Sequence, residues 1–261
     1  MDARRIVEEA MSGPWPLGLS EPSSERAIRH FEQMVARRRS GEPLQYVVGS
    51  WGFRTLDLFV DRRVLIPRPE TEEVVSVALV ELGRLAGDPV IVDLGTGSGA
   101  IALSMAKEGK RGSVWATDSS ADAVAVARAN LAGMGGSAAT RVRLVQGSWW
   151  SALPESLRGR ITLAVSNPPY VSTAEMASLP PVVADWEPTS ALEAGPTGLE
   201  AVSAIVSGAG EWLAARASLV LEIAPHQGAA VADLLTTAGF GSVQIKRDLA
   251  GRERVAVARP R

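Results

Sequence analysis

Hydrophobic and polar positions alternate along this chain with the periods of both strands and helices. From residue 89 onward, short apolar runs recur at regular intervals, and helical stretches separate most of them. Such alternation predicts a parallel, doubly wound α/β sheet. Seven runs are typical of its strands: PVIVDL (89–94), SVWATD (113–118), RVRLVQ (141–146), ITLAVS (161–166), SLVLEI (218–223), GSVQIK (241–246) and RVAVAR (254–259).

The connection between the last two runs is short. Only RDLAGRE (247–253) separates them, whereas a parallel crossover needs a dozen or more residues. The last strand is therefore predicted to be antiparallel to its neighbours.

The first 88 residues follow a different pattern. Helical spacing of Ile28, Phe31, Met34 and Val35 predicts an amphipathic helix over 24–39, after loop material at 12–24. The run at 46–66 alternates as a β-hairpin does. The next segment, PRPETEEVVSVALVELGRLAG (67–87), predicts a further helix.

In that further helix, Thr71 is a candidate N-cap, acidic residues favour the first turn, and Gly87 marks the end. We therefore expect a helical N-terminal region (1–45), a linking β-hairpin (46–68) and a main domain (69–261).

Composition narrows the possible chemistry. The 261 residues include no cysteine, which excludes a disulfide scaffold, a thiolate metal site and a cysteine nucleophile. Two histidines argue against a histidine-based metal site, so no metal is expected. The formal net charge of −2 gives no general attraction to nucleic acid. No secretion signal or membrane-spanning run is visible, so a soluble, cytoplasmic protein is expected.

A glycine-rich turn follows the first run of the main domain. In DLGTGSGAIA, Gly95, Gly97 and Gly99 remove side chains where a strand passes into a helix, so that a ligand can approach the backbone. The spacing is neither that of a dinucleotide-binding turn nor that of a phosphate-binding P-loop.

Two acidic residues accompany this turn. Asp118 ends the next strand, where a carboxylate can accept hydrogen bonds from a ribose diol, although an aspartate there can also be a helix cap. Asp93 ends the first strand, and can face a cationic group or brace the loop. Together they indicate a nucleoside-binding site.

The motif NPPY, residues 167–170, follows the fourth strand. Prolines cannot donate to a sheet ladder, so Pro168 and Pro169 end the strand and stiffen the turn. The Asn167 side-chain carbonyl and the Pro168 backbone carbonyl can accept the two N–H groups of a planar nitrogen, and Tyr170 can cover its face.

These features resemble the class I S-adenosylmethionine-dependent methyltransferases, whose Rossmann-like seven-stranded sheet ends in an antiparallel strand. NPPY is similar to the motif of members that methylate planar nitrogens, in adenine, guanine or glutamine. The resemblance implies S-adenosylmethionine as cofactor and S-adenosylhomocysteine as product.

A more specific resemblance runs from about residue 30 to the end. The chain is similar to the HemK/PrmC family, the glutamine-N5 methyltransferases of peptide chain release factors. The substrate implied is the glutamine of the Gly-Gly-Gln loop in class I release factors. The charge balance and the lack of a long apolar run predict no nucleic-acid or membrane partner. The segments that carry the resemblance are GEPLQYVVG (41–49), IPRPETE (66–72), EPTSALEAGPTGLE (187–200), LEIAPHQG (221–228) and RDLAGRERV (247–255).

The resemblance also implies roles for individual residues. Asn167 to Tyr170 would form the catalytic motif, with Asn167 and Tyr170 also holding the substrate. Pro67, Arg68 and Glu70 would line the mouth of the site, unless Arg68 simply pairs with a nearby glutamate. Cofactor contacts would come from Asp93, Gly95, Thr96, Gly97, Gly99, Asp118, Ser148, Trp149 and Asn167.

The chain departs from the family pattern at two places. Ser148 stands where an aspartate usually precedes an aromatic residue, which predicts a weaker contact to adenine. The helical N-terminal region, which by the resemblance contacts the release factor, is shorter than usual for the family.

Three alternatives stay open at this point. The acceptor could be a glutamine of another protein, such as a ribosomal protein, or the amino group of a nucleic-acid base. A non-catalytic protein with a decayed site is the third, and the intact glycines, Asp118 and Asn167 argue against it.

Overall fold

The computed structural model describes residues 2–11 and 24–260. The N-terminal part consists of α1 (Asp2–Ala10), α2 (Glu25–Arg39) and α3 (Leu44–Val48), which share a small apolar core of their own. Helix α2 is confirmed, with Ser24 as its N-cap. Its apolar stripe is only partly buried, because Met34 is enclosed while Ile28 and Phe31 stay 46% and 37% exposed. The predicted loop at 12–24 lies, apart from Ser24, outside the described residues.

The predicted hairpin is present but shorter than expected. Strands β1 (Ser50–Phe53) and β2 (Leu56–Phe59) pair antiparallel. Residues 46–48, which were expected in the hairpin, belong instead to α3. Gly49 ends that helix with φ +81°, a conformation that glycine adopts without strain.

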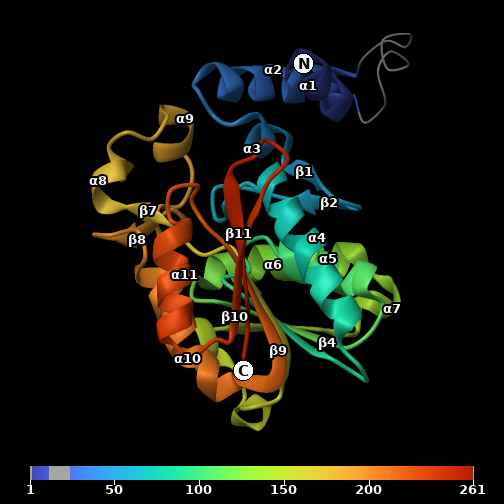
Figure 1. The fold of residues 1–261 in the computed structure, drawn as a ribbon. Coiled ribbons are helices and arrows are strands. Elements are labelled where there is room, and N and C mark those ends of the chain that lie inside the picture. Colours follow the sequence, from blue (N-terminus) through green and yellow to red (C-terminus); the bar gives the residue numbers. More distant parts are fainter. Residues whose placement is uncertain (1, 12–23, 261) are drawn as a thin grey trace.

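The main domain is built on a seven-stranded sheet, and all seven predicted strands are confirmed. Its order is β10-β11-β9-β6-β3-β4-β5, with β11 antiparallel to both neighbours (Figure 1). The chain runs from β3 to one side of the sheet and returns to β6 on the other side. This reversal leaves a crevice at the carboxyl ends of the central strands. The strands are β3 (Val90–Leu94), β4 (Ser113–Asp118), β5 (Val142–Gln146), β6 (Ile161–Ser166), β9 (Leu213–Glu222), β10 (Ser242–Arg247) and β11 (Glu253–Arg259).

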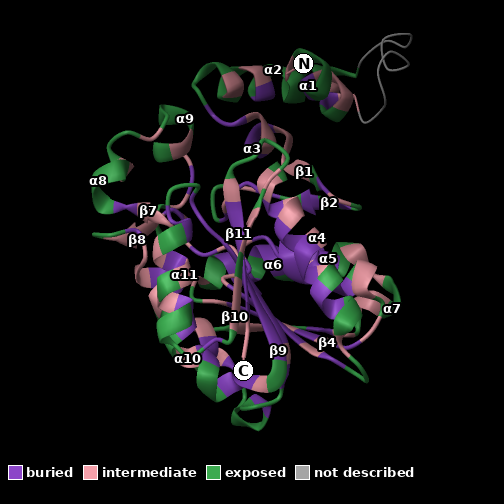
Figure 2. Ribbon diagram, viewed as in Figure 1, coloured by how far each residue is buried: buried purple, intermediate pink, exposed green. Residues whose placement is uncertain are grey.

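Helices cover both faces of the sheet, whose strands are largely buried (Figure 2). Neighbouring strand residues point to opposite faces, so Ile91 and Val92 enter two different apolar clusters. The first cluster includes α4 (Pro69–Arg84), α5 (Ala100–Gly109) and α6 (Ala121–Met134), and the second includes α10 (Glu200–Trp212) and α11 (Gly228–Thr237).

The remaining elements are short. A segment between β6 and α10 carries the strands β7 (Val171–Ser172) and β8 (Glu193–Gly195), with the helices α8 (Thr173–Met176) and α9 (Pro181–Ala184) and a 3₁₀ turn, η4 (Thr189–Ala191). The others are α7 (Gly136–Ala139) and the 3₁₀ turns η2 (Trp149–Ala152) and η3 (Glu155–Leu157). Among the helices of the described residues, none is long and apolar enough to cross a membrane.

Two predictions about α4 were wrong. Its N-cap is Arg68, and Pro69 occupies the first turn, where its missing N–H costs nothing. Thr71 lies inside the helix, and its hydroxyl binds a distant carboxyl group instead of a backbone amide. The helix ends at Arg84 with Leu85 as its C-cap, before Gly87.

Candidate functional site

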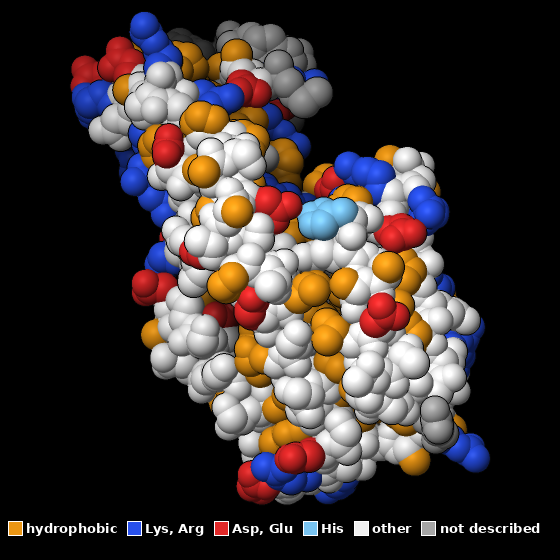
Figure 3. All heavy atoms as spheres, turned by 60° about the vertical axis from the view of Figure 1, so that its left-hand side comes forward, with side chains coloured by type: hydrophobic (Ala, Val, Ile, Leu, Met, Phe, Trp, Pro, Cys, Tyr) orange, Lys and Arg blue, Asp and Glu red, His pale blue; other side chains and the backbone are white. Residues whose placement is uncertain are grey.

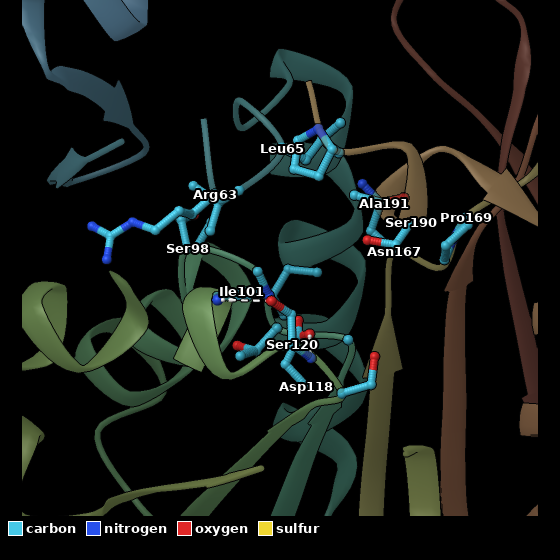
Figure 4. A pocket seen from close by; sticks show the side chains of 18 of the residues that line it. Arg63, Leu65, Ser98, Ile101, Asp118, Ser120, Asn167, Pro169, Ser190 and Ala191 are labelled. Carbon is cyan, nitrogen blue, oxygen red and sulfur yellow. Dashed lines mark hydrogen bonds between the residues drawn. The ribbon is translucent and has the colours of Figure 1, made fainter. Parts of the chain in front are cut away.

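A pocket lies in the crevice at the carboxyl ends of β3, β4 and β6. It contains about 1010 Å³ of space, including open solvent at its mouth. Asp118 and Ser120 line one side, and Asn167, Ser190 and Ala191 line another (Figure 4). The structure brings together nine predicted site residues in this lining: Pro67, Gly95, Thr96, Gly97, Asp118, Ser148, Trp149, Asn167 and Pro169.

The glycine turn connects β3 to α5 and forms one wall. Gly95, Gly97 and Gly99 all have positive φ, at +76°, +55° and +88°. A side chain at Gly95 would meet the ring of Trp149, since an added Cβ would lie 3.2 Å from it. The turn therefore needs glycine both for its backbone conformation and for the close approach of the indole.

Asp93 braces the turn from beneath and does not line the pocket. Its Oδ2 accepts a hydrogen bond from Thr96 Oγ1 at 2.6 Å and one from the Ala102 amide at 3.1 Å. Burial raises the pKa of Asp93 to about 7, against the opposing effect of these two hydrogen bonds. Gly99 likewise shapes the turn from outside the lining, where an added Cβ would press on Leu103.

Asp118 faces the glycine turn from the end of β4. Its Oδ2 accepts the Gly97 amide at 2.9 Å, and its Oδ1 accepts the Ser120 amide at 2.9 Å. Burial raises the pKa of Asp118, and the two backbone amides oppose that effect. Each carboxylate oxygen keeps further accepting capacity toward the pocket.

The two tryptophans after β5 have different roles. Trp149 lines the pocket beside Ser148, with a left-handed backbone at φ +44°. Trp150 is buried in the core, where it stacks on Trp212 and donates its indole N–H to the carbonyl of Ile205 at 2.8 Å. Trp149 thus belongs to the site, and Trp150 belongs to the scaffold.

The NPPY motif leaves the end of β6 and crosses the pocket. Asn167 Nδ2 donates to the hydroxyl of Thr71 at 3.1 Å. Pro169 lines the pocket, whereas Pro168 is buried and Tyr170 is half-buried behind them. Burial is the main cause that raises the pKa of Tyr170, followed by the nearby carboxylate of Glu222. Gln227 fixes the end of the motif by donating to the Tyr170 carbonyl at 3.1 Å.

The predicted residues around the start of α4 do not all line the pocket. Pro67 lines the pocket. Arg68 instead pairs with the buried carboxylate of Glu187, which also accepts the Ile66 amide at 3.2 Å. Glu70 pairs with Arg252 at 3.0 Å. Arg68 and Glu70 thus join the mouth of the site to neighbouring segments, and neither lies in the lining.

The sequence patterns did not point to several residues of the site. Thr71, which the sequence pattern made a candidate helix cap, lines the pocket. Ser120 is the N-cap of α6 and also a lining residue. Pro188 and Ser190 also lie in the lining. Their segment, 187–200, stood out by family resemblance alone.

Comparisons with known proteins agree with this geometry. A family model described as "Methyltransferase small domain" matches residues 76–179, and one described as "PrmC N-terminal domain" matches residues 15–49. The crystal structure of the hMettl16 catalytic domain with a MAT2A 3'UTR hairpin has a TM-score of 0.62 at 14% identity, over 90% of this chain and 81% of that one. A methyltransferase from Pyrococcus furiosus has a TM-score of 0.55 at 18% identity, over 87% and 97%. At such identities these structures show the shared fold alone.

The strand order, the glycine turn that opens onto the crevice and the methyltransferase match define a class I S-adenosylmethionine-dependent methyltransferase. Two relatives named release factor glutamine methyltransferase narrow the class. The one from Cereibacter sphaeroides is 40% identical over 99% of this chain and 90% of its own length, and that from Gloeobacter violaceus is 42% identical over 98% and 90%. The chain belongs to the release factor glutamine methyltransferase family.

Proposed function

We propose that the protein transfers a methyl group from S-adenosylmethionine to the side-chain amide nitrogen (N5) of a glutamine in class I peptide chain release factors, in their Gly-Gly-Gln loop. Family membership supports this acceptor. The observation that carries the proposal is the placement of Asn167. Its NH₂ group is bound by Thr71, so its carbonyl oxygen is free to accept an N–H of a substrate amide in the pocket.

The residues of the pocket fit S-adenosylmethionine. The carboxylate of Asp118 is held by two backbone amides and can accept the hydroxyls of a ribose. The bare backbone of Gly95 and Gly97 admits the ligand closely, and Trp149 and Ile101 offer apolar surface to an adenine. When bound, S-adenosylmethionine supplies an electrophilic methyl group.

In this proposal, the NPPY motif makes methylation of an amide nitrogen possible. An amide nitrogen is a poor nucleophile, because its lone pair is delocalised into the carbonyl group. We assign to Asn167 Oδ1 and the Pro168 carbonyl the task of accepting the two N–H groups, which aims the nitrogen at the methyl donor. Tyr170 would cover the face of the planar amide.

We assign recognition of the release factor to the N-terminal region (1–45), with the hairpin (46–68) as the link to the catalytic domain (69–261). The helices of this region stand away from the main body, beside a hollow in the surface (Figure 3). Their separate apolar core supports a distinct unit. Because the proposed substrate acts on ribosomes, the proposal places the enzyme in the cytoplasm.

A methyl-transfer assay tests the proposed function. Purified protein and labelled S-adenosylmethionine are offered a class I release factor, the same factor with its loop glutamine changed to alanine, total ribosomal protein, RNA and DNA. We expect label on the wild-type factor alone. Equal labelling of the alanine variant, or label only on ribosomal protein or nucleic acid, would overturn the proposed acceptor.

A further inference from the structure

Three side chains from distant parts of the chain form a hydrogen-bonded row that ends at the pocket. Glu222 lies at the end of β9, Thr71 lies in the first turn of α4, and Asn167 follows β6. Thr71 Oγ1 lies 2.7 Å from Glu222 Oε2 and 3.1 Å from Asn167 Nδ2. Thr71 and Glu222 are both buried, at 4% and 1% exposure. Water therefore cannot readily take the place of either group in the hydrogen bond between Thr71 and Glu222.

The chemistry of the row determines its direction. A hydroxyl group has one proton to donate, and an ionised carboxylate can only accept. Burial raises the pKa of Glu222 to about 7, so its carboxylate is ionised above that pH and accepts the proton of Thr71. The remaining lone pairs of Thr71 can then only accept. The side chain that meets those lone pairs must be a donor, so Asn167 turns its NH₂ group toward Thr71 and its carbonyl oxygen away from it.

The opposite orientation of Asn167 would present an NH₂ group to the substrate. The acceptor amide also carries N–H groups, so two donors would face each other and no hydrogen bond would form. The two orientations differ by a rotation of about 180° of the terminal amide, which has nearly the same shape both ways. Packing alone cannot distinguish them, whereas the hydrogen-bond row can.

We infer that Thr71, with its proton held by Glu222, is a positioning residue for methyl transfer, because it fixes the side-chain amide of Asn167 with the oxygen facing the acceptor nitrogen. The inference rests on the proposed function, because it concerns an acceptor that presents N–H groups to Asn167. It adds two residues, from α4 and β9, to a motif that is otherwise local to the end of β6.

Kinetics of matched variants test this role. Thr71→Val keeps the shape but removes the hydroxyl, and we expect kcat to fall about tenfold with little change in the Kd for S-adenosylmethionine, the size that loss of one hydrogen bond implies. Thr71→Ser restores the hydroxyl and should restore kcat to within about twofold of wild type. Glu222→Gln should lower kcat less than Thr71→Val does, because the glutamine oxygen can still accept.

The chain offers a matched control away from the pocket. Ser218 Oγ donates to Glu81 Oε2 at 2.9 Å, and both residues are buried. Ser218→Ala therefore removes the same kind of hydroxyl–carboxylate bond, and should lower the melting temperature without lowering kcat. Wild-type kcat in Thr71→Val, or an equal loss in Ser218→Ala, would overturn the inference.

A measurement on the free protein separates this inference from the proposed function. In NMR spectra at pH 8, an NOE between the Asn167 side-chain NH₂ and the Thr71 methyl group is expected in wild type. Slow exchange of those NH₂ protons is expected in wild type and Ser218→Ala, and faster exchange in Thr71→Val. Absence of the NOE in wild type, or unchanged exchange in Thr71→Val, would refute the positioning role whatever the acceptor is. If both signals behave as expected and the release factor is not labelled, the acceptor is wrong and the orientation of Asn167 stands.

Discussion

In the proposed function, different residues of the pocket hold the cofactor and aim the substrate. Gly97 and Asp118 are hydrogen-bonded to each other at the first part, and Asn167 lies at the second. Since no hydrogen bond joins Asn167 to the glycine turn in the described structure, a substitution at one part should leave the other intact.

Variants at the two parts should therefore separate binding from transfer. Asn167→Ala should lower kcat by about 100-fold or more, as loss of a group that aligns the reacting atoms does, with the Kd for S-adenosylmethionine unchanged. Gly97→Val should abolish cofactor binding, because valine is strained at φ +55° and its side chain would enter the pocket. Calorimetry and the transfer assay measure both. Parallel loss of binding and transfer in Asn167→Ala would contradict the division.

Buried carboxyl groups predict an unusual dependence of stability on pH. Burial raises the pKa of both Asp93 and Glu222 to about 7, from ordinary values of 3.8 and 4.5. The folded state thus binds these protons more tightly than the unfolded state does. This contribution to stability is fully present below about pH 4 and is lost as the pH rises toward 7.

We therefore expect the melting temperature of the cofactor-free protein to fall between pH 5 and pH 8. In Asp93→Asn, one of the two groups no longer titrates, so the fall should be shallower. Thermal denaturation at half-unit pH steps measures both slopes. A melting temperature that rises with pH over this range in wild type would show that the carboxyl groups are ionised well below pH 7.

Helix α10 shows how packing decides the effect of the same substitution at two nearby positions. An added Cβ at Gly208 would lie 2.4 Å from Trp150 Cδ1, whereas one at Gly210 meets no atom within 4 Å. Gly208 is therefore the point at which the helix packs closely on the indole of Trp150.

Gly208→Ala should lower the free energy of unfolding by about 1–3 kcal/mol through overpacking. Gly210→Ala should raise it by up to about 1 kcal/mol, because alanine favours a helix more than glycine does. Urea denaturation of the two variants measures the difference. A gain in stability for Gly208→Ala would mean that Trp150 can move away without cost.

How well the sequence predicts an element or a residue's role depends on how far apart along the chain the interacting residues lie. The seven strands and the glycine turn have local patterns, since buried strands are continuous apolar runs and tight turns need glycine. Helix α3 has five residues, too few to show a helical period. The role of Thr71 has no local pattern at all, because its two partners lie 96 and 151 residues away. A hydroxyl near a helix start suggests a cap until those partners are placed beside it.

At the scale of the whole molecule, a buried asparagine connects the hairpin to the main domain. Asn130 of α6 accepts the Phe59 amide at 2.7 Å, and donates to the carbonyls of Phe59 and Ser98 at 3.0 and 2.8 Å. It thereby connects the hairpin to the loop that carries the glycine turn.

Asn130→Ala should lower the free energy of unfolding by about 2–3 kcal/mol, because it leaves buried backbone groups of two segments without partners. It should also weaken cofactor binding several-fold, since Ser98 lines the pocket. Denaturation and calorimetry on the same preparation measure both effects. Reduced stability with unchanged affinity would show that the hairpin and the glycine turn are not coupled.

The position of β11 between β9 and β10 has a consequence for how the chain is made. Among the described strands, β10 has β11 as its neighbour in the sheet and reaches β9 only through it. On the ribosome β10 is synthesised first, and its backbone groups have no partner in the sheet until β11 follows. The pairing of β10, β11 and β9 can therefore form only after β11 has left the exit tunnel. Until then β9 also lacks its neighbour on this side, so the strand that carries Glu222 is an open edge of the sheet.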